Sequence, residues 1–385
     1  MKALDLDFTG AQVLVPGQGL ARARLSMADG RIADAPVGRA VDASGYLLLP
    51  GIVDIHGDAF ERHLAPRRGA APDMAEGVAS VAAELAANGI TTGVIAQFHS
   101  WEGGLRGPDH AARVFTALRD AGNIHGTDMR PQLRFEIGQL EAYDTLPDWL
   151  AQWDVGYLVY NDHLPHDRLA QGKTPPRLTG QALKAGRNPE KHLAMLMDMH
   201  RRYPEVPKAL DDLSARLRAQ GVTLGYHDAR TAPECVAMKT RGAALAEFPE
   251  TPQAAQAARD LGQGVIMGAP NTVRGSSQRG NASARDMIAA GLCDALASDY
   301  HYPALRAAVF ECVDSGMCTF EQGWALVSTG PARLLGLEDR GTLRPGLRAD
   351  ITVIDETTRR VAACFAGGSV TCMTGEFASR IFAAP

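Results

Sequence analysis

The sequence predicts an α/β protein: a (β/α)8 TIM-like barrel with a small β-sandwich domain formed from both termini. In the middle of the chain, eight apolar strand-like runs alternate with helical stretches rich in alanine and leucine. Continuously apolar strands separated by helices are typical of a buried parallel sheet. Both ends instead contain short strand-like pieces without a helical period. We therefore expect a composite β-sandwich from 1–50 and 340–385, and a barrel from 51–339.

The two ends of the chain resemble each other in pattern. AQVLVPG, ARLSMADGRI and GYLLLPG near the N-terminus are separated by turn signals such as Asp29-Gly30. ADITVID and VAACFAGGSVTCMTG near the C-terminus are strand-like in the same way. The expectation is that they meet in one small β unit. Two unrelated terminal flaps are the alternative.

The central runs are long enough and numerous enough for a closed barrel. Helical stretches at 74–89 and 209–221 end at Gly89 and Gly221, where a C-cap glycine belongs. Eight β-α units over about 290 residues suit a barrel of typical size. An open doubly wound sheet is the alternative fold. The eight runs are 51–56, 90–97, 132–138, 155–161, 222–228, 243–249, 264–270 and 294–300.

The composition is ordinary for a soluble globular enzyme, because 45% of the 385 residues are hydrophobic and 22% are charged. The net charge of −5 gives no global positive field for nucleic acid, so an anionic substrate needs local cations. No signal peptide and no membrane-length apolar run is evident, so we expect a cytoplasmic protein. The six cysteines form no C-x-x-C pair and are expected to be reduced packing residues.

Polar residues cluster where the strands of the predicted barrel end, which is where barrel enzymes place their chemistry. A lone histidine there is more often a structural residue, but five strand ends each provide a nitrogen or oxygen donor suited to zinc, manganese or iron. The remaining histidines, at 99, 110, 125, 166, 192 and 200, are expected to be solvated or capping groups. The candidate metal ligands are His56, Asp58, Glu136, His163, His227 and Asp299.

Three motifs resemble the amidohydrolase superfamily. PGIVDIHGD at 50–58 is similar to its first-strand motif, GITT at 89–92 to its second strand, and RGTLRPGLRADITVID at 340–355 to the return into its small β domain. Most members have H-x-H on the first strand, whereas Asp58 replaces the second histidine here. The resemblance implies a metal-dependent hydrolase.

The replacement indicates one subfamily. Segments 56–67, 227–233, 246–259, 267–281 and 297–305 resemble the diphosphatase family of the carbon–phosphorus lyase pathway. That resemblance implies cleavage of a phosphoanhydride of α-D-ribose 1-methylphosphonate 5-triphosphate, with release of pyrophosphate. Residues 97–130 and 165–205 lack this similarity, so the substrate loops are expected to differ.

The ligand set suits two divalent ions, with zinc expected and manganese or iron as alternatives. Glu136 would bridge the ions, because no lysine occupies that strand end. His56 and Asp58 would hold one ion, and His163 and His227 the other. Asp299 would bind metal and take the proton of the nucleophilic water. A site with a single metal is the alternative.

Two arginine-rich segments could bind phosphate. Glycines in the loop 267–281 would let backbone N–H groups approach a phosphate, and arginine can grip phosphate oxygens with two N–H groups. The segment 61–68 is the second candidate. A flexible surface loop and a salt-bridged loop are the respective alternatives. The candidate substrate-binding residues are His63, Arg67, Asn271, Arg274, Ser276, Arg279 and His301, with Ser277, Gln278 and Tyr302 as weaker ones.

The expected partner is a small phosphorylated molecule, with neither nucleic acid nor membrane involved, and the chain could form a homo-oligomer. A deaminase or amide hydrolase on the same scaffold would need the same metal ligands, but a neutral amide needs no arginine cluster. A non-catalytic scaffold is the other rival, and the intact ligand set argues against it.

Overall fold

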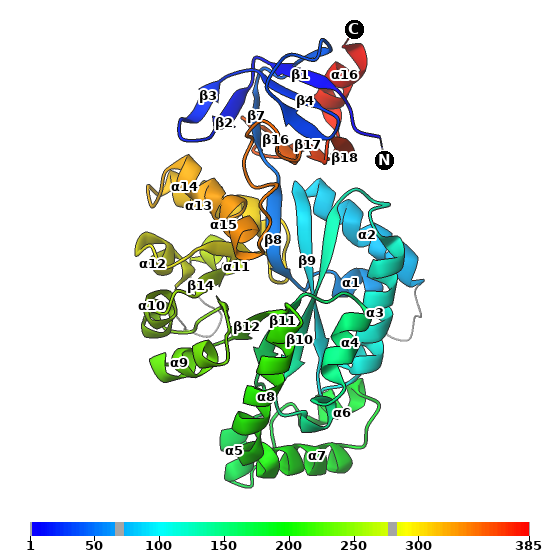
Figure 1. Cartoon of the computed structure of the whole chain (residues 1–385), viewed down its shortest axis with the longest axis vertical. Coiled ribbons are helices and arrows are strands. Elements are labelled where there is room, and N and C mark those ends of the chain that lie inside the picture. Colours follow the sequence, from blue (N-terminus) through cyan, green and yellow to red (C-terminus); the bar gives the residue numbers. More distant parts are fainter. Residues whose placement is uncertain (1, 66–72, 276–282, 385) are drawn as a thin grey trace. The chain divides into compact units, whose positions relative to one another are not determined.

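Eight parallel strands form the central sheet of the computed structural model, which describes residues 2–65, 73–275 and 283–384 (Figure 1). Their order is β15-β14-β13-β12-β11-β10-β9-β8. A parallel bridge between Gly57 and Asp299 joins β8 to the end of β15, the two ends of this order. The strands are β8 (Ile52–Gly57), β9 (Ile90–His99), β10 (Asp128–Glu136), β11 (Tyr157–Asn161), β12 (Thr223–His227), β13 (Leu245–Glu247), β14 (Gly264–Gly268) and β15 (Ala295–Ala297). Each strand coincides with one of the predicted runs, so the barrel is confirmed and the open sheet is excluded.

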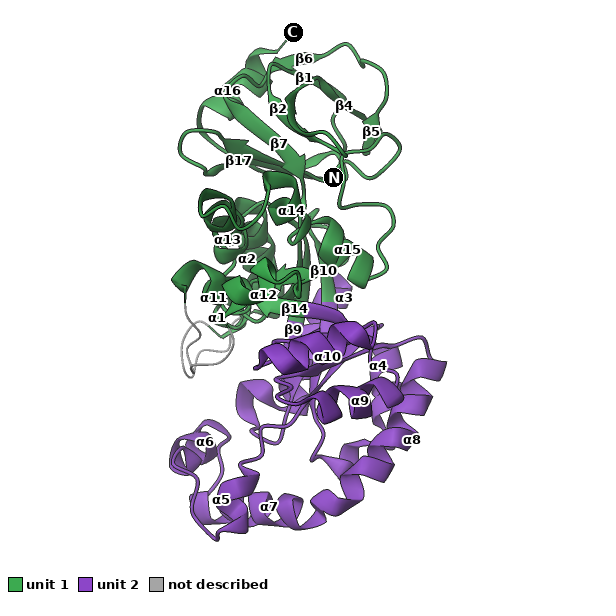
Figure 2. Ribbon diagram, turned by 90° about the vertical axis from the view of Figure 1, so that its left-hand side faces the viewer, with its two compact units in different colours: residues 1–95, 121–130, 266–385 green, residues 96–120, 131–265 purple. Residues whose placement is uncertain are grey.

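The chain divides into two compact units, coloured separately in Figure 2. Unit 1 contains residues 1–95, 121–130 and 266–385, and unit 2 contains residues 96–120 and 131–265. The domain boundaries expected from the sequence, 1–50 with 340–385 and 51–339, stay a prediction.

Unit 1 contains two further sheets built from both termini. The four-stranded sheet has the order β5-β4-β1-β6, and the six-stranded sheet has the order β18-β17-β16-β7-β2-β3. In the second sheet, C-terminal β16 pairs antiparallel with N-terminal β7. The strands are β1 (Leu6–Thr9), β2 (Gln12–Val15), β3 (Gly19–Arg22), β4 (Leu25–Ala28), β5 (Arg31–Ala33), β6 (Ala40–Asp42), β7 (Tyr46–Pro50), β16 (Ile351–Asp355), β17 (Val361–Ala366) and β18 (Ser369–Met373).

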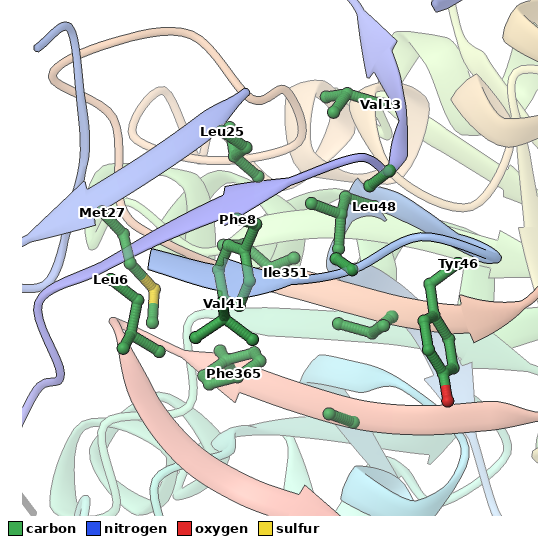
Figure 3. Close-up of a cluster of buried hydrophobic side chains, with 14 of the residues drawn as sticks. Leu6, Phe8, Val13, Leu25, Met27, Val41, Tyr46, Leu48, Ile351 and Phe365 are labelled. Atoms are coloured by element: carbon green, nitrogen blue, oxygen red, sulfur yellow. The ribbon is translucent and has the colours of Figure 1, made fainter. Parts of the chain in front are cut away.

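The hydrophobic core of the small β domain formed by the two termini lies between these two sheets (Figure 3). Phe8 of β1 and Phe365 of β17 meet edge to face, with ring centroids 5.6 Å apart. Leu48 and Ile351 are fully buried in the same cluster. Burying a large apolar side chain contributes about 1.5–3 kcal/mol, so this cluster ties the two termini together. The composite β domain is confirmed, and the alternative of two unrelated flaps is excluded.

The helices of unit 1 follow the barrel strands β8, β14 and β15 or close the chain. Asp73 caps α2 by accepting a hydrogen bond from the Ala75 backbone, and Gly89, with φ +76°, follows the helix in the left-handed conformation. The helices are α1 (Glu61–Leu64), α2 (Met74–Ala87), α11 (Ala269–Arg274), α12 (Ala284–Ala289), α13 (Ala304–Asp314), α14 (Phe320–Ala325), α15 (Thr329–Leu334) and α16 (Gly375–Ala383).

Unit 2 contains the other barrel helices. The helix expected at 209–221 begins earlier, at Val206, because Pro207 in the first turn favours a helix start. The helices are η1 (Gly104–Arg106), α3 (Pro108–Ala121), η2 (Leu140–Ala142), α4 (Leu146–Gln152), α5 (His166–Ala170), α6 (Leu178–Lys184), α7 (Pro189–Arg202), η3 (Tyr203–Glu205), α8 (Val206–Ala219), α9 (Ala232–Thr240) and α10 (Pro252–Asp260).

Within the three described ranges, every helix is too short or too polar to cross a membrane. All six cysteines are free, and four of them are buried.

Candidate active site

Two backbone hydrogen bonds join the end of β8 to the end of β15 in unit 1. The Asp299 N–H donates to the His56 carbonyl at 3.0 Å, and the Asp58 N–H donates to the Asp299 carbonyl at 2.9 Å. The His56 side chain is fully buried, whereas Asp58 and Asp299 are half-buried. The structure thus brings together three of the predicted ligands, from opposite ends of the sequence.

Asp54 fixes this junction, and the sequence analysis did not assign it a role. Its carboxylate accepts hydrogen bonds from the Ser298 N–H at 3.0 Å and from the Ser298 hydroxyl at 2.5 Å. Burial raises the pKa of this carboxyl, although the Ser298 hydrogen bonds oppose the shift. Asp54 precedes His56 by two residues on one strand, so alternation along β8 was a signal for it.

Glu136 and His163 form a tight pair in unit 2, at the ends of β10 and β11. The Glu136 carboxylate is buried, and its Oε1 lies 2.5 Å from His163 Nδ1. The other oxygen, Oε2, accepts from the His163 N–H at 3.0 Å and from the Trp101 indole N–H at 3.3 Å. The carboxylate therefore fixes both the ring and the backbone of His163.

Asp228 lies next to both predicted histidine ligands of unit 2. Its Oδ2 lies 2.8 Å from His227 Nδ1 and 3.8 Å from His163 Nε2. Burial lowers the pKa of His163, but Glu136 and Asp228 outweigh it and raise the pKa to about 9. Burial also raises the pKa of Asp228, but the two histidines hold it well below its ordinary value. Burial lowers the pKa of His227. The two histidines therefore favour the ionised form of the Asp228 carboxylate.

Arg134 and Glu247 complete this part of unit 2, and the sequence analysis missed both. An Arg134 guanidinium nitrogen lies 3.1 Å from His227 Nε2. Glu247 is paired in register with His227, and their ligand atoms lie within 4.8 Å of each other. Within unit 2, His227 and Glu247 offer an imidazole nitrogen and a carboxylate oxygen that could hold a metal ion. The sequence held a signal for both residues, since Arg134 precedes Glu136 by two positions and Glu247 lies near the end of the predicted run 243–249.

Three residues that lie within two positions of a barrel strand's end have left-handed backbones although they are not glycine. They are Asp228 (φ +60°), Phe248 (φ +50°) and Asp299 (φ +55°). Such conformations cost on the order of 1–3 kcal/mol each and cluster at functional sites. The strain occurs at the strand ends that bear the candidate site residues.

The expected phosphate loop begins as a helix, which corrects the sequence analysis. Asn271 and Arg274 belong to α11, and Gly275 behind it adopts a positive φ, +77°. The Arg274 guanidinium is exposed and donates to the Tyr300 hydroxyl at 2.6 Å. The chain forms a helix here because Ala269 and Pro270, at its first two positions, favour a helix start after β14. Arg274 and Tyr300 thus lie together in unit 1. Ser276, Ser277, Gln278 and Arg279 lie outside the described residues.

The second arginine-rich segment is salt-bridged as far as it is described. Arg62 and His63 both pair with Glu84 of α2. His63 Nε2 lies 2.5 Å from Glu84 Oε2. This contact supports the alternative of a salt-bridged loop for this part of 61–68. Arg67 lies outside the described residues. His301 is exposed after β15, whereas Tyr302 is buried.

Three of the histidines expected to be solvated or capping are buried instead. His99 ends β9, and His110 and His192 lie on the inner faces of α3 and α7. Burial lowers the pKa of all three imidazoles. The expectation was wrong because a neutral imidazole packs as an aromatic ring, which polarity alone does not reveal.

Comparison with known proteins identifies the family of the chain and a relative of stated activity. A sequence profile of the amidohydrolase family matches residues 60–364. The chain is 31% identical to the α-D-ribose 1-methylphosphonate 5-triphosphate diphosphatase of Escherichia coli (strain K12) over 325 residues, which is 82% of this chain and 84% of the relative.

Solved structures with the same fold are more distant in sequence. The β-aspartyl dipeptidase of Fervidobacterium islandicum AW-1 superposes with a TM-score of 0.62 at 13% identity, covering 96% of this chain and 97% of the other. Molinate hydrolase gives a TM-score of 0.64 at 12% identity, covering 100% and 98%. At these identities the likeness concerns the fold.

Proposed function

Because the chain belongs to the amidohydrolase family, we propose that this hydrolase is metal-dependent and cleaves a phosphoanhydride of α-D-ribose 1-methylphosphonate 5-triphosphate, releasing pyrophosphate. The observation that carries the proposal is the similarity to the Escherichia coli diphosphatase, which extends over 82% of the chain. The strand-end donors support it, as does the Arg274–Tyr300 pair. A cytoplasmic location and a small phosphorylated substrate are part of the proposal.

The donor set fits a divalent transition metal. His227 and Glu247 of unit 2 supply an imidazole nitrogen and a carboxylate, the ligands that zinc prefers together with thiolates. When bound, such an ion supplies Lewis-acid chemistry, because it polarises phosphoryl oxygens and makes water more acidic. We propose that two ions are held by His56, Asp58, Glu136, His163, His227 and Asp299, the six predicted ligands, together with Glu247.

The chain's own residues would bind the substrate and move the proton. Asp299 takes the proton of the attacking water on its carboxylate, a role consistent with its half-buried place at the end of β15. Arg274 donates to phosphate oxygens from its exposed guanidinium. Tyr300, hydrogen-bonded to Arg274, keeps that guanidinium from swinging away.

A substrate screen tests the proposal. Purified protein is incubated with the ribose triphosphate and with nucleoside triphosphates, in zinc, manganese or magnesium, and pyrophosphate is measured with and without a chelator. We expect pyrophosphate release that chelation abolishes. Hydrolysis by metal-free protein, or ammonia release from an amide or amine in place of pyrophosphate, would overturn it.

A further inference from the structure

Trp101 contacts the candidate site through one buried hydrogen bond. Its indole N–H donates to Glu136 Oε2 at 3.3 Å, and the side chain is 3% exposed. Trp101 lies between β9 and η1, in the part of the chain that lacks similarity to the diphosphatase motifs. We propose that Trp101 is a positioning residue for the Glu136–His163 pair. The inference rests on the proposed function only in taking that pair as part of the site.

Trp101 is held by residues of the segment that follows β11. Arg187 donates to the Trp101 backbone carbonyl, and the ring of buried His192 lies 6.0 Å from the indole. The Trp101 side chain is also part of a buried apolar cluster. That cluster contains Trp101, Leu164, Leu169, Leu178, Leu196 and Met199. The indole is therefore fixed from several sides, and a fixed donor can fix its acceptor.

The same cluster reaches His163 by two routes. Leu164 is the next residue along the chain and packs in the cluster, which restrains the backbone of His163. Trp101 restrains the Glu136 carboxylate, whose other oxygen contacts His163 Nδ1. A buried carboxylate that loses a donor can rotate and weaken its remaining contacts. The helices α5 to α7 thus act on the Glu136–His163 pair through Trp101 and Leu164.

The test compares Trp101→Phe with Trp153→Phe. Both variants retain a buried ring and lose one indole hydrogen bond, because Trp153 donates to Thr116 at 2.8 Å in the same unit. Metal affinity is measured by competition with a chelator, alongside kcat, KM and the unfolding temperature. Changing an outer partner of a metal ligand costs about 10–100-fold in metal affinity or activity. We expect that loss for Trp101→Phe, and less than twofold for Trp153→Phe. Equal metal affinity and kcat in the two variants would overturn the proposal.

A second measurement is independent of metal and substrate. In metal-free protein, Trp101→Phe and Glu136→Gln should lower the unfolding temperature by less in combination than the sum of their separate effects, because one removes the donor of a hydrogen bond and the other removes the charge of its acceptor. Trp153→Phe combined with Glu136→Gln should be additive. Additive losses for the first pair would contradict the inference, even if the chain hydrolyses no triphosphate.

If Glu136→Gln does not fold, the Trp101 indole N–H can be followed directly by ¹⁵N NMR in the wild type. The sequence has four tryptophans, so the Trp→Phe variants assign the indole signals. We expect slow hydrogen exchange at Trp101, and rapid exchange at this signal would overturn the proposal.

Discussion

Glu136 Oε1 lies 2.5 Å from His163 Nδ1, so the carboxylate is the hydrogen-bond partner of one of the two ring nitrogens. A histidine that binds metal usually donates its other ring N–H to a carboxylate or carbonyl, which fixes its tautomer. Nε2 is then the nitrogen left for a ligand, and it faces Asp228 at 3.8 Å. The pair therefore has the arrangement that is usual for a metal-binding histidine.

The first prediction concerns pH. The folded protein raises the pKa of His163 to about 9, against about 6.5 in an unfolded chain. Because the folded pKa is the higher one, the stabilisation is fully present below about pH 6.5 and is lost as the pH rises through 9. Thermal unfolding of metal-free protein should therefore show a falling Tm from pH 6.5 to 9. His163→Gln should flatten this decline, while His125→Gln should leave it intact. An equal decline in both variants would refute the assignment.

The second prediction concerns Glu247, which the sequence analysis missed. Glu247→Gln should lower the metal content of the purified protein, because it removes a charged donor beside His227. Gln132 and Tyr157 hydrogen-bond to its Oε1, and glutamine keeps the shape of that contact. Glu250→Gln is the control, since this nearby glutamate pairs with Arg230. Elemental analysis of the two variants decides, and equal metal content would argue against Glu247 as a ligand.

The third prediction concerns the proton acceptor. Asp299→Asn should lower kcat by about 10²–10⁴, the usual contribution of general acid–base catalysis, while most of the metal remains bound. Asp294→Asn at the start of β15 is the control, because that carboxylate pairs with Arg333. Steady-state kinetics with metal analysis measures both effects. A near-normal kcat for Asp299→Asn would leave this residue a structural role.

The fourth prediction concerns phosphate recognition. Arg274→Ala should cost one or two charge-assisted hydrogen bonds, worth about 1.5–3 kcal/mol each. That is roughly a 10- to 150-fold loss in kcat/KM per contact, with unchanged metal content. Arg333→Ala, which removes another exposed guanidinium of unit 1, should have little effect. If triphosphate hydrolysis survives Arg274→Ala, this arginine does not bind the phosphates.

The fold could be predicted from sequence because its signals are local. Runs such as GIVDIH and VGYLVYN are continuously apolar, and Gly89 marks the end of α2. The strand-end rule also predicted that His56, Asp58 and Asp299 lie close together, because strand ends of a barrel meet at one rim. Their role as metal ligands stays a prediction. Their adjacency follows from the pairing of β8 with β15.

What could not be predicted depends on contacts between distant residues. Nothing in the segment 61–68 reveals that Glu84 binds Arg62 and His63. The contact of Trp101 with Glu136 spans 35 positions and depends on how the segment after β11 packs. Arg274 was expected in a loop, since its glycine-rich surroundings concealed the short helix α11. Local pattern fixes neither side-chain partners nor short helices, because tertiary packing decides both.

One measurement tests the central claim most directly: ³¹P NMR of α-D-ribose 1-methylphosphonate 5-triphosphate incubated with the metal-loaded protein. The account predicts that the triphosphate signals disappear while pyrophosphate and a 5-monophosphate appear in equal amounts, with the phosphonate signal retained. Chelation should stop the reaction. An unchanged triphosphate, or the release of inorganic phosphate with a 5-diphosphate left behind, would contradict the account.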